Sequence, residues 1–531
     1  MKKIIYSLIL VTVFSSFVTA QNIELPDVTT IIDGETIKVG LDALPDFSDV
    51  LIIDNGSGEV VPELPDVDAP ADSDLEKSKN STEEKSIFAE GLLGGGYPTM
   101  FLGDFSIFRT IGDSPFKLGF SYNSAVGYAG HSSTDGFNDR ITKLTLEKSY
   151  HKNQFSWGFN GNYQSVSNGL QKHINGISSI NQDAYAGNGN VAYEFDNGFS
   201  IGFDAGLNLY NRYADVTEGS FPVISFLNLT PELLFKWHGN GFLVDFICNY
   251  NFGTDTSNTI SDDNFHRGEF KLDFGWQNEF VNVYANAAAV VGNVINDNSV
   301  VVPFTVGIDA GIPVKFSDRK MIISAAGGID SKLAQIYELE NKYKFTALSF
   351  VPGEQSDWYG KFEMSVPVKD GFTGIVGFEY RQTAFDNIVY NPLFTNISSY
   401  GTFDYSGKTN QQFKSYLSLS YTYKFMTITG NWNSNWLDVP ALENENFVSV
   451  DLNLQNDKSS FGVDVFAGFG LDKEKVVPVI NFEGFVKVTS ALSAVLSAND
   501  IIELFKNEQR IYAGDYITRG GNVCLLLKFS F

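Results

Sequence analysis

Residues 155–164 read FSWGFNGNYQ, and residues 199–209 read FSIGFDAGLNL. In both stretches, bulky apolar side chains recur at every second position, and mostly polar or small residues stand between them. Residues 417–425, LSLSYTYKF, repeat the pattern. Because successive side chains of a β-strand point to opposite sides, each stretch predicts a strand with one apolar face and one wet face.

The lengths of such segments, and of the links between them, favour a strand that crosses a membrane. The segments run for about 10 to 15 residues, as a tilted strand in a bilayer requires, whereas strands of soluble proteins usually have about 5 or 6. The links alternate between short and long along the chain. Short links are expected at 111–114, 196–198, 239–241, 317–320 and 369–371, and long loops at 128–140, 169–182, 335–357, 386–410 and 506–519.

The number of segments predicts a closed barrel. From Ile87 to the end of the chain we expect about 22 strands, within a range of roughly 18 to 24. Unpaired strand edges cannot face hydrocarbon, so the sheet must close on itself. The fold class is therefore predicted as all-β, a transmembrane antiparallel β-barrel. Its short turns are expected on the periplasmic side, its long loops outside, and both ends of an even-numbered barrel on the periplasmic side.

The N-terminal region differs from the barrel in composition. Lys2 and Lys3 precede an apolar run and the small-residue site at residues 18–20, which predicts a signal peptide cut after Ala20. Residues 21–85 contain 17 acidic residues and 4 lysines, and such a segment buries too little apolar surface to fold. We expect it to be a largely disordered periplasmic segment, with residues 86–531 forming the barrel. It repeats ELPDV at 24–28 and 63–67, which indicates either a docking motif for a periplasmic partner or an acidic spacer.

Composition and motifs argue against several function classes. The net charge of -26 and the lack of a dense basic run do not suit nucleic-acid binding. The five histidines are scattered, and no nucleophile elbow, phosphate loop or cysteine cluster occurs, so we expect no enzyme activity, cofactor or metal. Cys248 is expected to point outward and Cys524 inward, so a disulfide between them is not predicted.

The C-terminus carries the most specific local signal. Residues 523–531 read VCLLLKFSF, in which apolar residues at odd positions alternate with others, and the chain ends on an aromatic. This resembles the terminal strand that barrel-assembly machinery recognises in outer-membrane proteins, with Phe529 and Phe531 as the signal residues. The predicted surroundings are therefore outer-membrane lipid and that machinery.

The segment before the last strand suggests a family. Residues 499–505 read NDIIELF and are followed by Tyr512, Tyr516 and an Arg519-Gly520 pair. This resembles the end of TonB-dependent receptors, whose 22-stranded barrel matches the expected strand number. The resemblance implies a transport barrel over residues 86–531. It covers only the barrel half of such a receptor, because this chain lacks a counterpart of the folded plug domain. Residues 35–39, ETIKV, are similar to the box that contacts TonB.

A barrel of this size without a plug would leave a wide hole, since diameter grows with strand number. Inward-folded loops or the acidic segment are expected to narrow it. The leading hypothesis is a channel or transporter for a solute. The alternatives are a surface barrel whose loops 335–357 and 386–410 bind a ligand, and a scaffold whose acidic tail recruits a periplasmic partner. The predicted lumen-lining residues are Asp204, Lys271, Asp273, Glu379, Arg381, Lys424, Asp464 and Lys528.

Overall fold

The computed structural model describes residues 87–530 except 111–113, 260–263, 296–299, 315–318, 347–350, 370, 385–390, 407–409, 440–441, 457–459, 472–477 and 507–509. Within these ranges, 22 strands form one antiparallel sheet. The predicted signal peptide, the acidic segment, the ETIKV stretch and Phe531 lie outside the described residues.

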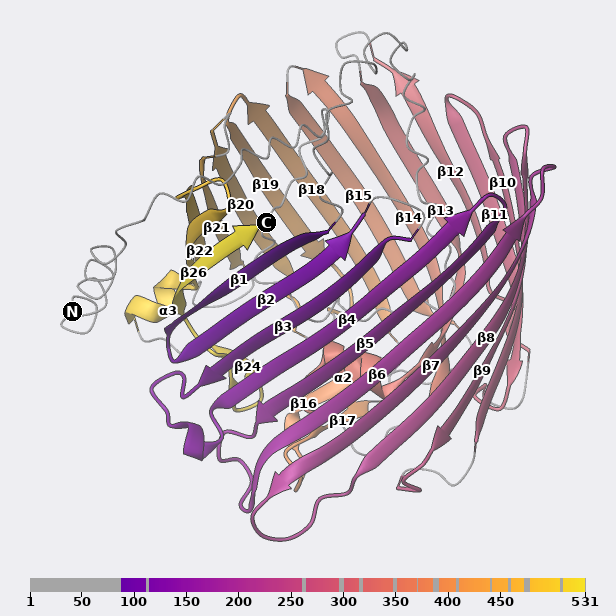
Figure 1. The fold of residues 1–531 in the computed structure, drawn as a ribbon. Helices are drawn as coiled ribbons and strands as arrows, with labels where there is room; N and C mark the ends of the chain where they lie inside the picture. The colour runs from indigo at the N-terminus through magenta and orange to yellow at the C-terminus, as the bar shows by residue number, and fades with distance from the viewer. Residues whose placement is uncertain are drawn as a thin grey trace. The chain divides into compact units, whose positions relative to one another are not determined.

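The strands of this sheet form the wall of the barrel (Figure 1). They are β1 (Phe88–Tyr97), β2 (Met100–Arg109), β3 (Phe116–Val126), β4 (Asn138–Lys152), β5 (Phe155–Gly169), β6 (Ile177–Glu194), β7 (Phe199–Val216), β8 (Ile224–Gly239), β9 (Phe242–Asp255), β10 (Phe265–Gln277), β11 (Val281–Gly292), β12 (Phe304–Pro313), β13 (Lys320–Ala334), β14 (Gly353–Lys369), β15 (Phe372–Thr383), β18 (Gln411–Tyr423), β19 (Met426–Asn435), β20 (Asn446–Gln455), β21 (Phe461–Gly470), β22 (Val479–Lys487), β23 (Leu492–Asn499) and β26 (Asn522–Ser530).

The remaining elements are short and lie in the connections. They are η2 (Ser133–Asp135), α2 (Ile336–Lys342), β16 (Asn391–Ile397), β17 (Phe403–Ser406), α3 (Ile501–Lys506), β24 (Ile511–Ala513) and β25 (Tyr516–Ile517). In the described part of the chain, no helix is both long and apolar enough to cross a membrane.

The first and last strands close the sheet. β1 pairs with β2 on one side and with β26 on the other, with Glu90 opposite Ser530 and Tyr97 opposite Val523. Each strand otherwise pairs with its neighbours along the chain, the connection from β15 to β18 passing over the separate hairpin of β16 and β17. The predicted closed barrel of about 22 strands is confirmed.

The two faces of the wall differ as the alternation predicted. In the middle of β10, Phe270 is 52% exposed and Leu272 is 51% exposed, and the polar Lys271 and Asp273 lie between and beyond them. Large apolar side chains stay exposed in this way around most of the wall. A continuous exposed apolar surface of this kind is stable when lipid covers it.

The connections at the two ends of the barrel differ in length. At one end, two-residue turns join β4 to β5, β8 to β9 and β18 to β19, and β1 begins and β26 ends there. At the other end lie the long connections 335–352, 384–410 and 500–521. The exception at that end is the two-residue turn between β1 and β2. The predicted alternation of short and long links is thus present.

Some predicted loops are shorter in the structure. The loop expected at 169–182 spans only 170–176, because β6 begins at Ile177 and pairs with β7 as far as Val216. The loop expected at 335–357 ends at 352, where β14 begins. The two cysteines are free; Cys524 is buried on the inner face, and Cys248 lies between the exposed Phe246 and Tyr250 on the outer face.

Candidate functional site

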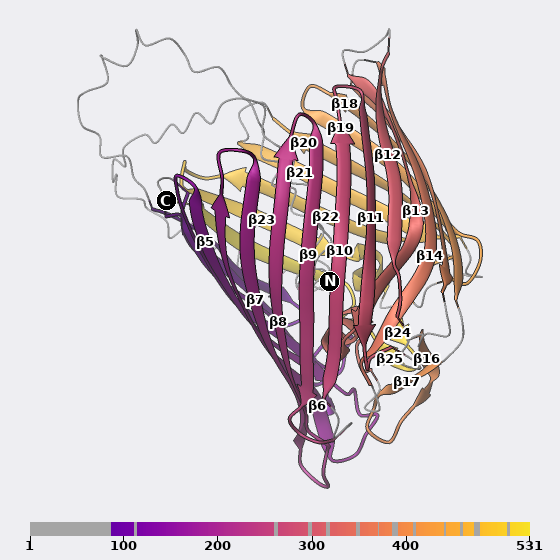
Figure 2. The same ribbon diagram turned by 90° about the vertical axis from the view of Figure 1, so that its right-hand side faces the viewer.

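The long connections fold together at their end of the barrel. We call the loop cap the described parts of connections 170–176, 217–223, 335–352, 384–410 and 500–521. Figure 2 shows β16, β17, β24 and β25, which belong to the last two of these, close together at one end of the barrel. A buried apolar cluster joins all five connections; its members include Leu170, Phe221, Phe345, Phe403 and Tyr516.

The centre of the cap is packed without solvent. Leu170, Phe403 and Tyr516 are each 0% exposed. The rings of Phe345 and Tyr516 stack with their centroids 4.1 Å apart, and the ring of Phe403 meets Tyr516 edge-on at 5.8 Å. Aromatic contacts of this geometry stabilise a cluster beyond the area it buries. The cap is therefore a folded layer rather than a set of separate surface loops.

Hydrogen bonds connect cap segments that are far apart in the sequence. The Tyr516 hydroxyl donates to the carbonyl oxygen of Gly401 at 2.9 Å. The Gln171 amide donates to the carbonyl of Ile517 and accepts from its backbone N–H, each at 2.9 Å. These bonds satisfy backbone groups that the cap removes from water, as buried polar groups require.

A buried ion pair attaches α2 to the wall. The guanidinium of Arg212 on β7 pairs with the carboxylate of Glu340 on α2, and the two side chains are 0% and 2% exposed. Thr346 donates its hydroxyl to Glu340 at 2.8 Å and accepts a hydrogen bond from Arg212 at 3.3 Å. Removing one partner of such a pair leaves an uncompensated charge in a dry site.

Two further ion pairs hold other parts of the cap. Arg267 on β10 binds Glu354, the second residue of β14, through two hydrogen bonds of 2.8 and 3.0 Å. At the far side of the cap, Arg519 binds Asp139 on β4 at 2.7 Å and Asn123 on β3 at 2.8 Å. Cap segments are thus fixed to the wall on β3, β4 and β7, and the strand that follows the 335–352 connection is fixed to β10.

Beside the cap centre, α2 packs on a second apolar cluster of the wall. Ile336 and Leu339 of α2 lie against Tyr210, Phe226 and Phe265 on β7, β8 and β10. Between α2 and the lumen face of strands β5 to β8 there remains a small hollow of about 50 Å³ that is partly open to solvent.

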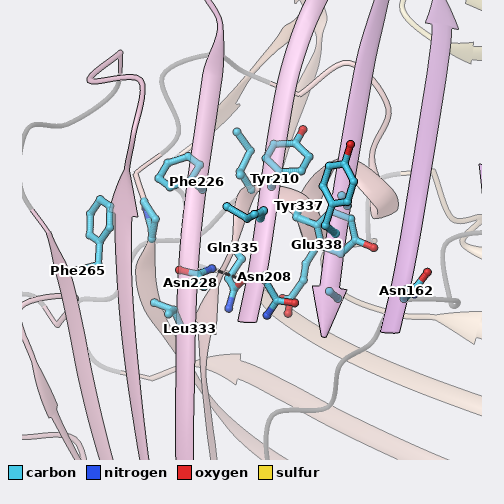
Figure 3. A pocket seen from close by; sticks show the side chains of 16 residues that line it. Asn162, Asn208, Tyr210, Phe226, Asn228, Phe265, Leu333, Gln335, Tyr337 and Glu338 are labelled. Atoms are coloured by element: carbon cyan, nitrogen blue, oxygen red, sulfur yellow. Dashed lines mark hydrogen bonds between the residues drawn. The ribbon is translucent and has the colours of Figure 1, made fainter. Parts of the chain in front are cut away.

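Figure 3 shows the side chains that line this hollow. From the wall come Asn162, Asn208 and Asn228 with Tyr210 and Phe226, and from the connection carrying α2 come Gln335, Tyr337 and Glu338. Asn228 donates to the side-chain oxygen of Gln335 at 3.0 Å, which ties the start of α2 to the wall. The lining combines amides with aromatic rings.

The strand register aligns the wall amides. Asn162 lies opposite Ala186, Ala186 opposite Asn208, and Asn208 opposite Asn228, so the three asparagines share one level across four strands. We call these three residues the amide row. The next lumen-facing level adds a directly paired Asn160 and Asn188. Sequence reasoning placed Asn160, Asn162 and Asn208 on wet faces but did not single them out, because their alignment depends on register.

Apart from Lys424, the predicted lumen-lining residues lie on strands that are spread over the wall. Lys271 and Asp273 pair at 3.2 Å along β10, and Arg381 pairs with Glu379 on its own strand and with Asp330 at 3.2 Å. These ion pairs run along the wall rather than across the lumen. Asp204, Asp464 and Lys528 lie on β7, β21 and β26, respectively.

One predicted lumen residue is placed elsewhere. β18 ends at Tyr423, and Lys424 lies in the two-residue turn before β19 with a positive φ of 50°. Lys424 therefore lies outside the strand, because the sequence alternation continues past the end of β18 into the turn. Of the two residues predicted to signal barrel assembly, Phe529 lies in β26 with its ring 6.3 Å from that of Phe105.

No metal site is assembled from the residues that the structure describes. There, no set of three or more His, Cys, Asp or Glu side chains is arranged to hold a metal ion. The hollow beside α2 is lined by amide and aromatic side chains instead.

Comparison with known proteins gives relatives by fold alone. No family model matches the chain. No curated protein matches its sequence. Among solved structures, the FrpB iron transporter from Neisseria meningitidis (F3-3 variant) aligns with a TM-score of 0.62 and 9% identity over 85% of this chain and 82% of that one.

Two other solved structures are similar to the same extent. The siderophore receptor PirA from Pseudomonas aeruginosa has a TM-score of 0.59 and 9% identity, with 85% of this chain and 81% of that one covered. The copper transporter OprC has a TM-score of 0.61 and 10% identity, with 84% and 82% covered. The described barrel therefore has the fold of the TonB-dependent receptor barrels that these structures contain.

Proposed function

We propose that this protein is an outer-membrane transporter barrel that admits a solute through its long-loop end when the loop cap opens. The observation that carries the proposal is the folded cap over a lumen lined with polar side chains. An exposed apolar outer face supports insertion in lipid, and the predicted signal peptide, cut after Ala20, supports export.

The fold relatives support a transport role. The similar structures are described as iron, siderophore and copper transporters or receptors. Their identity to this chain is at most 10%, so their cargo does not carry over. The predicted lumen residues would give the path mixed charge, which disfavours strong selection of one ion sign. They are Asp204, Lys271, Asp273, Glu379, Arg381, Asp464 and Lys528.

The packing of the cap favours gated transport over the alternatives. A passive channel needs an open path, and the packing of Leu170, Phe403 and Tyr516 where the loops meet supports a gate instead. A surface adhesin displays its loops, whereas parts of 335–352 and 384–410 are packed into the cap. The acidic segment 21–85 is proposed to dock a periplasmic partner or to act as a spacer, and Phe529 and Phe531 are proposed to engage the assembly machinery.

The experiment is single-channel conductance of the refolded mature protein in planar bilayers. We compare the intact chain with a variant in which residues 385–409 are replaced by a short Gly-Ser link. The control replaces 472–477 in the β21–β22 connection, whose flanking described residues belong to neither buried cluster. Gated transport predicts silence in the intact protein and the control and steady conductance in the cap variant.

Two results would count against the proposal. Steady conductance of the intact protein would mean a passive channel, and silence of the cap variant would mean that the lumen is closed elsewhere. A third protein without residues 21–85 shows whether that closure comes from the acidic segment.

A further inference from the structure

The two ends of the barrel differ in the length of chain that could close them. At the end where β1 begins and β26 ends, which we call the short-turn end, none of the ten connections between the described wall strands is longer than six residues. The two longest are 110–115 and 314–319. At the other end, connections 384–410 and 500–521 are several times longer and meet in the loop cap. Chain length therefore allows these connections to cover one end and restricts what they can cover at the other.

The width of the barrel decides whether short connections can close it. Strands about 4.8 Å apart and tilted by about 40° give a circular wall of 22 strands a radius of about 22 Å. Six residues that leave the rim and return to it reach about 12 Å inward. Two such connections on opposite sides would still leave an opening of roughly 20 Å between their tips. The connections at the short-turn end therefore leave the mouth of the lumen open.

Side chains on the inner face of the wall are in contact with water. Lys361 and Glu363 lie in the middle of β14, and both are exposed. They alternate with Phe362, which is 37% exposed on the outer face, so both charged side chains point into the lumen. In the loop cap, by contrast, Phe403 and Tyr516 are each 0% exposed. Water thus has access to the lumen beside β14 and is excluded from the centre of the cap.

We propose that the lumen of the closed protein is a vestibule of the periplasm, which water and solutes enter through the short-turn end while the loop cap shields the lumen from the outside. The orientation follows from the rule that the short turns of such barrels face the periplasm. The inference rests on the proposed function for the opening of the cap. It adds that a solute which passes the cap diffuses on into the periplasm, so that cap opening sets the rate of passage.

The test is the labelling of single cysteines in cells with a flexible polyethylene glycol maleimide, which is too large to cross the outer membrane but can thread an open mouth. The background carries Cys248→Ala and Cys524→Ala. Lys361→Cys reports on the lumen. Asp515→Cys, in the exposed turn between β24 and β25, reports on the outside. Glu279→Cys, at a position whose side chain is 75% exposed in the β10–β11 turn, reports on the periplasm.

The three positions should differ in their response to permeabilisation of the outer membrane. In intact cells we expect labelling at position 515 alone. After permeabilisation, the labelling of Lys361→Cys should rise from background to the level of Glu279→Cys. Heat-dependent gel mobility checks that each variant has folded.

Two results would overturn the inference. Labelling of Lys361→Cys in intact cells would mean that the lumen opens outward, and its protection in permeabilised cells would mean that the inner mouth is closed. If deletion of residues 21–85 removed that protection, the closure would belong to the acidic segment. Protection together with conductance of the cap variant would leave the proposed gate intact. Labelling from the periplasm with a silent cap variant would refute the gate and leave the vestibule.

Discussion

The wall and the loop cap are built by different kinds of contact. Each wall strand pairs with a strand next to it along the chain, apart from the closing pair of β1 and β26. In the cap, Gln171 bonds Ile517 across 346 positions, and Arg519 bonds Asn123 across 396. A wall of local pairs follows from a repeating pattern, whereas a cap of distant pairs depends on the tertiary arrangement of the whole barrel.

The largest effect is expected at the buried ion pair between the loop cap and the wall. Arg212→Met removes one partner of a fully buried pair and leaves Glu340 without its counter-ion, which costs about 3–5 kcal/mol. We expect faster hydrogen exchange over residues 336–346 and frequent channel openings in bilayers. The control is Arg381→Met, whose side chain is 37% exposed and whose loss should cost under about 1 kcal/mol. Equal exchange in the two variants would mean that the ion pair does not hold the cap.

A charge placed on the outer face of the wall is expected to destabilise the barrel. Leu272 lies in the middle of β10 and is 51% exposed toward the proposed lipid. Leu272→Lys should lower the free energy of unfolding in lipid vesicles by about 2–4 kcal/mol, because the ammonium faces hydrocarbon. Guanidinium titration measures this loss of stability, and hydrogen exchange in the loop cap should change little.

The neighbouring Asp273 supplies the matched control for this change. Asp273→Asn alters a side chain on the lumen face and should leave the titration midpoint nearly unchanged. A similar loss in both variants would mean that the two faces of β10 do not differ in their surroundings.

The sequence was sufficient for the wall because its pattern is local. Residues 199–209 alternate with period two, and that alternation puts Asp204 on the other face of the strand from the exposed Phe203. At Lys424 the alternation runs past the end of β18, since it does not reveal where a strand stops and a turn with positive φ begins. Local rules thus predict faces better than ends.

The cap and the amide row could not be predicted in this way. Nothing near Arg212 in the sequence indicates Glu340, because the pair forms only when α2 folds across to β7. Asn162 and Asn208 become neighbours through the register of β5, β6 and β7. The motif at Tyr516 and Arg519 was recognised by resemblance, but its packing into the cap needed the tertiary structure.

A smaller effect sharpens the difference between polar contacts inside the cap and on the wall. Tyr516→Phe keeps the stacked ring but leaves the Gly401 carbonyl unpaired, which should cost about 1 kcal/mol. Exchange over 398–403 and 511–517 should quicken by about fivefold. Tyr380→Phe, which loses an exposed hydroxyl bond to Gln382 on the wall, is the control and should change neither segment. If the two variants behave alike, the hydroxyl of Tyr516 contributes nothing specific to the cap.

The smallest effect concerns pH and separates the cap from the wall by titration. Burial raises the pKa of Glu503 on α3 to about 7, and the nearby Asp500 adds to the rise while Arg510 opposes it. A carboxyl whose folded pKa lies above its unfolded value holds its proton more tightly when folded. The stability that this carboxyl contributes to the folded state is fully present below about pH 4.5 and is lost as the pH rises through 7.

Hydrogen exchange over residues 511–517, corrected for intrinsic rates, should therefore quicken a few-fold between pH 5 and 8. Exchange in β10 should not follow this titration. Glu503→Gln removes the titrating group and should flatten the pH profile. A profile that persists in this variant would assign the pH dependence to another group of the cap.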